Sequence, residues 1–93
     1  MPFELELAAT LRLAGWKVKI HDLEDGDEPH VTIYKKHETA WRFGLQSLQF
    51  LDDGRTWGQI HKRVGRAIEV NLDLLRAEWN RMHPHNSIDE WEA

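Results

Sequence analysis

His30 and Tyr34 lie four residues apart on a segment that alternates between polar and apolar residues, and Arg42 lies on a second such segment. If the two segments pair as antiparallel strands with Thr32 opposite Arg42, these polar side chains share one face of a sheet. An imidazole can transfer a proton, and a phenol and a guanidinium can stabilise an oxyanion or bind phosphate. We therefore take His30, Tyr34 and Arg42 as a candidate catalytic site of the kind a metal-independent nuclease could use. The alternative is that they are ordinary half-exposed strand residues.

The other histidines point to less specific roles. His61 falls on the apolar stripe of a predicted helix, where we expect a core or boundary residue with one hydrogen bond. His83 and His85 flank Pro84, but a lone imidazole pair without a third ligand is not a preorganised metal site. The chain has no cysteine, and its six glycines do not form a phosphate-binding loop. We predict no metal and no cofactor.

Basic residues define a second candidate surface, a face for phosphate groups. Its members are Arg12, Lys17, Lys19, Lys62 and Arg66. Lys62 and Arg66 stand four residues apart, on the same side of the predicted helix. The formal net charge is −4, which argues against a general nucleic-acid binder. The competing interpretation is the solvated side of an amphipathic sheet and helix.

The first twenty residues predict a hairpin. Apolar residues occupy every odd position from Phe3 to Leu13, which is the period of a strand with one buried face. A two-residue turn at 14–15 would place all the apolar side chains of both strands on one face. The pairs expected from this turn are Leu13 with Trp16, Leu11 with Val18, and Ala9 with Ile20. A rival helix through Ala8, Ala9 and Leu13, closed by Gly15, stays open.

A second hairpin follows an acidic loop at residues 21–29. Residues 31–34 and 40–45 alternate, and a polar turn around residues 36–38 separates them. We expect Val31 opposite Phe43 and Ile33 opposite Trp41. Residues 47–51 are predicted to form a short fifth strand before a turn at residues 52–54.

The period then changes to that of a helix. Thr56 and Gln59 have the spacing of a capping box, and apolar residues recur at helical spacing from Trp57 to Met82. This pattern predicts one long helix, or two helices broken near residues 70–72, ended by Pro84. The fold class expected is α+β, with an antiparallel sheet of about four to five strands in two consecutive hairpins and a helix or helix pair packed on one face.

Length and composition indicate a single α+β domain over residues 1–84 with a flexible acidic tail at 85–93. Most of the five tryptophans fall on predicted core faces. Trp91 is the exception, because it lies among acidic residues and suits either a docking peptide or a disordered end. The chain has no cysteine, no signal-peptide pattern and no apolar run of about 20 residues, so we expect a cytoplasmic protein.

Three segments resemble one bacterial family. They are residues 28–34 (EPHVTIY), residues 40–43 (AWRF) and the helical pattern Val70-Asn71-Leu72 with Leu75 and Trp79. Together they resemble the domain-of-unknown-function family 4160, over roughly residues 11–84. Its members carry a PPHVHV strand, a short hairpin and a C-terminal helix with a late tryptophan. This sequence departs from the family pattern at Glu28, which replaces the first proline, and at Thr32, which replaces the second histidine.

The resemblance implies an α+β fold and a small partner gene, in pairs described as toxin–antitoxin modules. The function expected from it is a bacterial toxin component that acts on RNA or a cellular protein and is neutralised by a cognate partner. The alternative is a non-catalytic interaction module or a homodimeric subunit, which would use an exposed strand edge or the apolar helix face. A weaker alternative is a nucleic-acid-binding regulator that uses the basic face, with salt-dependent binding.

Overall fold

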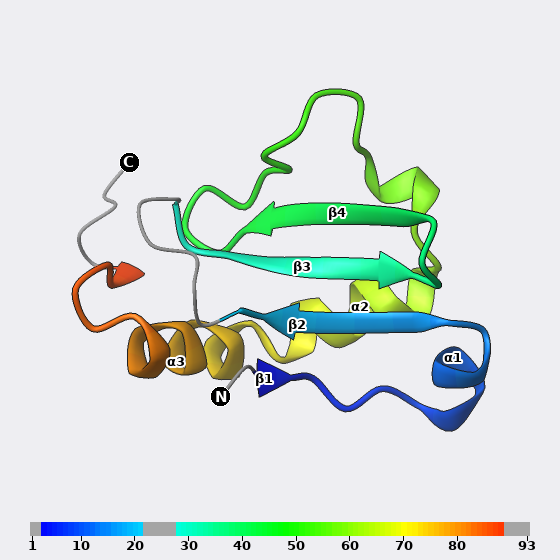
Figure 1. The fold of residues 1–93 in the computed structure, drawn as a ribbon, viewed down its shortest axis with the longest axis horizontal. Coiled ribbons are helices and arrows are strands. Elements are labelled where there is room, and N and C mark those ends of the chain that lie inside the picture. Colours follow the sequence, from blue (N-terminus) through cyan, green and yellow to red (C-terminus); the bar gives the residue numbers. More distant parts are fainter. Residues whose placement is uncertain (1–2, 22–27, 89–93) are drawn as a thin grey trace.

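The computed structural model describes residues 3–21 and 28–88. Four antiparallel strands form one sheet in the order β1-β2-β3-β4, and helices follow it in the chain (Figure 1). The strands are β1 Phe3–Glu4, β2 Trp16–Ile20, β3 His30–Lys35 and β4 Thr39–Gly44. The helical elements are α1 Ala9–Leu13, the 3-10 turn η1 Trp57–Gln59, α2 Lys62–Val70 and α3 Leu72–Met82. The predicted α+β class is confirmed.

The hairpin of β3 and β4 has the register that the alternation predicts. Val31 lies opposite Phe43, and Thr32 lies opposite Arg42. Residues 36–38 form the turn, and Lys36 has a φ of 54° there. The backbone N–H of Lys36 donates to the carbonyl of Gly15 at 2.8 Å, so this turn is fastened to the chain before β2. The second hairpin is therefore confirmed.

The first predicted hairpin is wrong. Residues 9–13 form the helix α1, and β1 is a two-residue strand that pairs with the far end of β2. Its register sets Phe3 opposite Ile20 and Glu4 opposite Lys19. Leu13, predicted to pair with Trp16, is 88% exposed instead. The rival helix is the interpretation that the structure supports.

Local chemistry explains why the chain coils there. Alanine, leucine and arginine are good helix formers, and residues 8–14 contain no β-branched residue except Thr10. Gly15 has a φ of +97°, and its N–H donates to the carbonyl of Arg12 at 3.0 Å. A glycine in the left-handed region after the last turn is a common helix ending. Gly15 thus ends a helix, where the hairpin prediction used it as a turn.

The long helical stretch divides into two helices, as one of the two predicted versions has it. The division falls at Asn71, whose side-chain amide donates to the carbonyl of Ala67 at 2.8 Å. The apolar stripe buries Val64, Ile68, Leu75 and Trp79. The capping box is present as well, but it begins the short turn η1 and not a long helix. In that turn the N–H of Thr56 donates to Oε1 of Gln59 at 3.1 Å.

Residues 47–51 form no fifth strand. Their only ladder contact among the described residues is one isolated bridge between Phe43 and Phe50. Two further backbone hydrogen bonds join this segment to β4, from Gly44 N–H to the Gln49 carbonyl and from Leu51 N–H to the Arg42 carbonyl. These contacts cover the end of the outer edge of β4, so that part of the edge is already satisfied.

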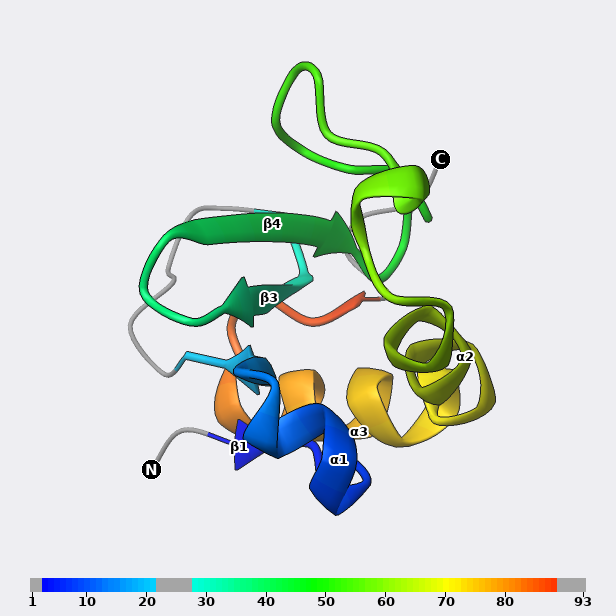
Figure 2. The same ribbon diagram turned by 90° about the vertical axis from the view of Figure 1, so that its right-hand side faces the viewer.

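The helices cover one face of the sheet and one of its ends. The buried residues of β2, β3 and β4 share a core with those of α2, including Val18, Ile33 and Val64. Figure 2 shows α2 beside the sheet, with the connection before η1 standing out beyond β4. The helix α3 crosses where β2 ends and β3 begins, since His83 Nε2 lies 2.8 Å from the carbonyl of His21. None of the helices in the described part of the chain has the length and apolarity that crossing a bilayer requires.

The segment after α3 packs on the domain further than predicted. Ile88 is 7% exposed, and its N–H donates to Oδ1 of Asn80 at 2.8 Å. The indole N–H of Trp79 donates to the carbonyl of Asn86 at 2.7 Å. Residues 85–88 are therefore tied to α3, whereas the prediction assigned them to a flexible tail. The rest of that predicted tail, including Trp91, lies outside the described residues.

Candidate functional site

His30 lies in the core and not on an open sheet face. His30 is only 1% exposed, and its Nδ1 lies 2.8 Å from the carbonyl oxygen of Glu28. A carbonyl can only accept, so Nδ1 carries the hydrogen in this contact. The imidazole also packs on the indole of Trp79, with ring centroids 5.4 Å apart. The expectation that His30 is half exposed is wrong, because α3 closes over this end of the sheet.

Arg42 holds a carboxylate from the connection after β4. Its Nε donates to Oδ2 of Asp52 at 3.1 Å, and a terminal nitrogen donates to Oδ1 at 2.7 Å. This paired geometry is the strong, planar form of the arginine–carboxylate contact. The hydrogen bond from Arg42 lowers the pKa of Asp52 below its usual value, and the positive charges of Arg42 and Arg55 add to the effect. The guanidinium therefore fastens residues 45–56 to the sheet.

Tyr34 is engaged as well. Its hydroxyl lies 2.7 Å from Nε2 of His21, and the two rings meet edge to face. By register, His30, Tyr34 and Arg42 do occupy one side of the β3–β4 hairpin, as predicted. Each of them, however, contacts a different internal group, and His30 is closed off from solvent. Their catalytic role stays a prediction that the geometry does not favour.

The basic residues predicted to share one face lie on both sides of the sheet. Lys17 and Lys19 alternate with the buried residues of β2, so they point away from α2. Lys62 and Arg66 belong to α2, on the other side (Figure 2). Arg12 is exposed on α1. A single continuous phosphate-binding stripe is therefore wrong, because the period of β2 directs its lysines away from the helix-covered face.

His61 is exposed and begins α2. Its Nδ1 accepts a hydrogen bond from the N–H of Arg63 at 3.1 Å, which caps the helix. The one expected hydrogen bond is present, but the core or boundary position is wrong, because the chain turns at Ile60 before the helix starts. His83 is buried and His85 is exposed. Across residues 3–21 and 28–88, no group of three or more His, Asp or Glu side chains could hold a metal ion.

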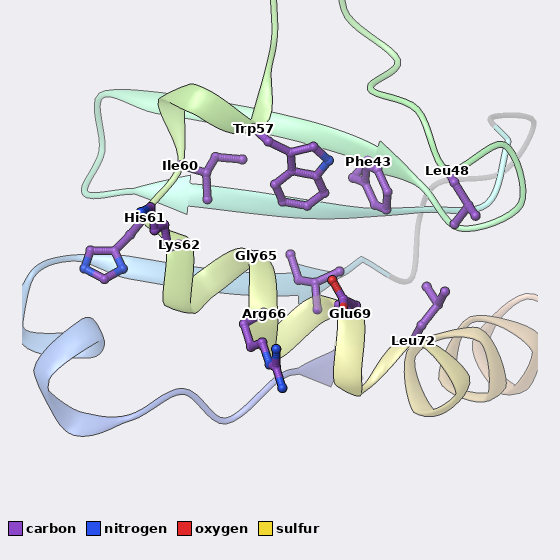
Figure 3. Close-up of a pocket in the computed structure, with 11 residues that line it drawn as sticks. Phe43, Leu48, Trp57, Ile60, His61, Lys62, Gly65, Arg66, Glu69 and Leu72 are labelled. Carbon is purple, nitrogen blue, oxygen red and sulfur yellow. The ribbon is translucent and has the colours of Figure 1, made fainter.

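A groove of about 490 Å³ lies between β4, η1 and α2 (Figure 3). Sequence reasoning did not predict it. The lining residues are Phe43, Leu48, Trp57, Ile60, His61, Lys62, Gly65, Arg66, Ile68, Glu69 and Leu72. Figure 3 shows the rings of Trp57 and Phe43 side by side, with Leu48 and Leu72 toward one end. A hollow of this size with mostly apolar walls falls in the range of binding pockets.

Aromatic rings build the wall of this groove. The ring centroid of Trp57 lies 4.8 Å from that of Phe43 and 4.9 Å from that of Phe50. Trp57 was expected in the core, yet it is 40% exposed. The reason is that η1 ends at Gln59 and Ile60 is extended, so the indole lies on the surface of α2 and not beneath it. A Cβ at Gly65 would contact the Trp57 ring at 3.4 Å, so this glycine lies directly against the indole.

Leu48 is the second exposed apolar residue of the groove. It is 49% exposed and has a φ of 58°. The left-handed region is uncommon for residues other than glycine, asparagine and aspartate. The cost of such a conformation is of the order of 1–3 kcal/mol, and it persists where the surroundings impose it. Here the backbone N–H of Leu48 donates to the carbonyl of Gly44 at 3.1 Å, which fixes the turn.

Positive charge lies along the helical side of the groove. Lys62 and Arg66 line it on α2, and among its described lining residues Glu69 is the one carboxylate. Arg66 also lines a smaller hollow of about 270 Å³ between α2 and the segment that leads into α1. The groove therefore combines apolar walls with a net positive edge.

The sequence held one signal of this groove. Gly65 interrupts an otherwise regular helical pattern, and such a glycine often serves a packing role.

Comparisons with known proteins add no relative. No protein-family model, curated protein or solved structure shows a significant match to this chain. The resemblance to the domain-of-unknown-function family 4160 therefore stays an expectation.

Proposed function

We propose that this protein is a non-catalytic interaction module that binds an apolar segment of a partner protein in the groove between β4, η1 and α2. In this proposal it acts as the binding member of a protein pair, which accords with the partner gene that the family resemblance implies. Its effect on a cell, toxic or otherwise, would follow from capturing that partner and not from a chemical reaction.

The observation that carries this proposal is that Leu48 and Trp57, two exposed apolar residues, line the same groove. Tryptophan is among the residues that contribute most to protein–protein binding, because its large ring loses much water contact on association. Leu48 adds apolar surface at a backbone conformation that costs free energy. A folded protein gains nothing in stability from presenting a strained, exposed leucine, whereas a binding surface does gain contact area.

Two other surfaces, the outer edge of β4 and the polar side of the β3–β4 hairpin, are less suited to binding a partner than this groove. The outer edge of β4 is partly covered by residues 49–51, which leaves less backbone for a partner strand to pair with. The polar side of the β3–β4 hairpin has its groups engaged internally, with Arg42 held by Asp52 and Tyr34 by His21. Neither of these surfaces presents exposed apolar side chains in the way that the groove does.

The test is capture of the product of the neighbouring gene. The tagged full chain and its Trp57→Ala variant are each co-expressed with that product and purified, and the amount retained is measured. We expect Trp57→Ala to retain at least about tenfold less partner than the unmodified protein. Leu13→Ala is the matched control, because Leu13 is an exposed apolar residue on α1 outside the groove.

Equal retention by all three proteins would refute the proposal. Circular dichroism of each variant shows whether it is folded before binding is compared. Growth of the host with and without the neighbouring gene adds an independent readout: a toxic effect that His30→Ala removes while Trp57→Ala leaves it intact would point to catalysis instead.

A further inference from the structure

We propose that the groove also binds residues 89–93 of a second copy of this protein, so that two copies form a dimer by exchanging these segments. The inference rests on the proposed function, because it names an occupant of the same groove. The segment reads Asp-Glu-Trp-Glu-Ala. When each copy inserts its segment into the other's groove, the arrangement closes on itself and stops at two copies.

The anchor of the segment matches the walls of the groove. Trp91 is a large ring with one polar N–H, and the groove presents the rings of Trp57 and Phe43 with Leu48 toward one end (Figure 3). Aromatic rings in edge-to-face or offset contact stabilise one another beyond the area they bury. A tryptophan inserted between such rings is the usual chemistry of a binding hot spot.

The charges match as well. Trp91 is flanked by Asp89, Glu90 and Glu92, three carboxylates within four residues. The helical side of the groove carries Lys62 and Arg66. Opposite charges at the edge of an interface speed association and select the correct partner, and their effect weakens as salt is added.

The place where the described chain ends favours a segment from another copy, because Figure 1 shows that end and η1 toward opposite ends of the longest axis. Ile88 is fixed beside Asn80, near the end of α3, while the groove meets α3 at Leu72. Eight residues of helix separate Asn80 from Leu72, a rise of about 12 Å. From Ile88 to Trp91 the backbone spans at most about 10 Å. We therefore assign the segment that fills the groove to a second copy.

Sedimentation equilibrium of the full chain tests the proposal. We expect self-association that weakens about tenfold or more in Trp91→Ala and in the groove variant Leu48→Asn. Leu48→Asn suits this purpose because asparagine tolerates the left-handed backbone, so the fold is kept while the apolar contact is lost. Leu13→Ala should associate as the unmodified protein does. Added salt should weaken the dimer.

A mixing experiment separates segment exchange from other kinds of dimer. Trp91→Ala keeps an intact groove, and Leu48→Asn keeps an intact segment. Each variant alone should be largely monomeric, but a mixture should form a heterodimer in which the groove of the first holds the segment of the second. Fluorescence transfer between differently labelled copies detects this heterodimer.

Several results overturn the inference. These are an unmodified protein that is monomeric at every soluble concentration, a dimer that Trp91→Ala leaves intact, and a mixture of the two variants that forms no heterodimer. Partner capture is measured separately through Trp57→Ala. If that capture depends on Trp57 while self-association is absent, the proposed function stands and the segment exchange fails; if neither depends on the groove, both fail.

Discussion

The imidazole of His83 stacks on the indole of Trp79 with ring centroids 3.9 Å apart. His30 packs on the same indole, so one tryptophan contacts two buried histidines. Each imidazole also bonds to a carbonyl, His83 to that of His21 and His30 to that of Glu28. These two carbonyls lie on either side of residues 22–27. The cluster thus fastens both ends of that connection to α3, which is a structural role for the histidine predicted to be catalytic.

Trp79 should be the residue on which the stability of this end of the fold depends most. Trp79→Ala opens a cavity in the core and removes the hydrogen bond to the carbonyl of Asn86, so we expect a loss of about 3–5 kcal/mol in the free energy of unfolding. Urea denaturation followed by circular dichroism measures it. Trp57→Ala, at a half-exposed tryptophan, should cost clearly less. Equal losses in the two variants would contradict the burial of Trp79.

His30→Ala should act on stability. The variant leaves the carbonyl of Glu28 without this hydrogen bond and removes a buried ring, and we expect a loss of about 1–3 kcal/mol in the free energy of unfolding. His37→Ala, in the exposed turn of the hairpin, should change it by no more than about 0.5 kcal/mol. If His30→Ala unfolds at the same urea concentration as the unmodified protein, His30 regains its standing as a candidate catalytic group.

The sequence was informative where one period excluded the other. In β3 and β4 the apolar residues of the alternation are β-branched or aromatic, which favours a strand. The strand pairing predicted from this alternation is the one that the structure has. Residues 3–13 are ambiguous, because Leu5 and Leu7 fit a strand while Leu7 and Leu11 fit a helix, and all three are buried. An extended start followed by a short helix buries them equally well. Alternation alone could not distinguish these outcomes.

The groove could not be predicted for a different reason. Its walls come from segments far apart in the chain, with Phe43 on β4, Leu48 in a turn and Trp57 in η1. Local patterns indicate which side chains prefer burial, but they do not indicate which of them a neighbouring helix leaves uncovered. The same limit explains His30, whose burial depends on α3, more than forty residues later in the chain.

Asp52→Asn should remove part of the acid sensitivity of the fold. The hydrogen bond from Arg42 lowers the pKa of Asp52, so the ionised carboxylate stabilises the folded state above the unfolded pKa of about 4, and this contribution is lost as the pH falls through the lower folded value. The difference in unfolding free energy between the unmodified protein and Asp52→Asn should be constant above about pH 5 and shrink below it. Urea titrations at several pH values measure it. A difference that grows on acidification would contradict the assigned direction.

Gly15→Ala should destabilise the junction between α1 and β2. Gly15 has a positive φ, and a Cβ there would lie 2.5 Å from Cγ of Lys36 and 3.2 Å from its backbone nitrogen. We expect a loss of about 1–3 kcal/mol from the backbone conformation, together with displacement of the hairpin turn. Gly58→Ala is the matched control, since its nearest contact would be 3.6 Å away, and it should be neutral or slightly stabilising. Similar melting temperatures for the two variants would show that α1 does not end as described.

Leu48→Asn should separate stability from binding. Asparagine adopts the left-handed backbone more readily than leucine does, and Leu48 is half exposed, so little buried apolar contact is lost. We therefore expect the free energy of unfolding to stay the same or rise by up to about 1 kcal/mol. Binding in the groove should weaken at the same time, because the apolar side chain toward one end has been replaced by an amide. A leucine that served only the stability of the fold would give the opposite pair of results, with lower stability and unchanged binding.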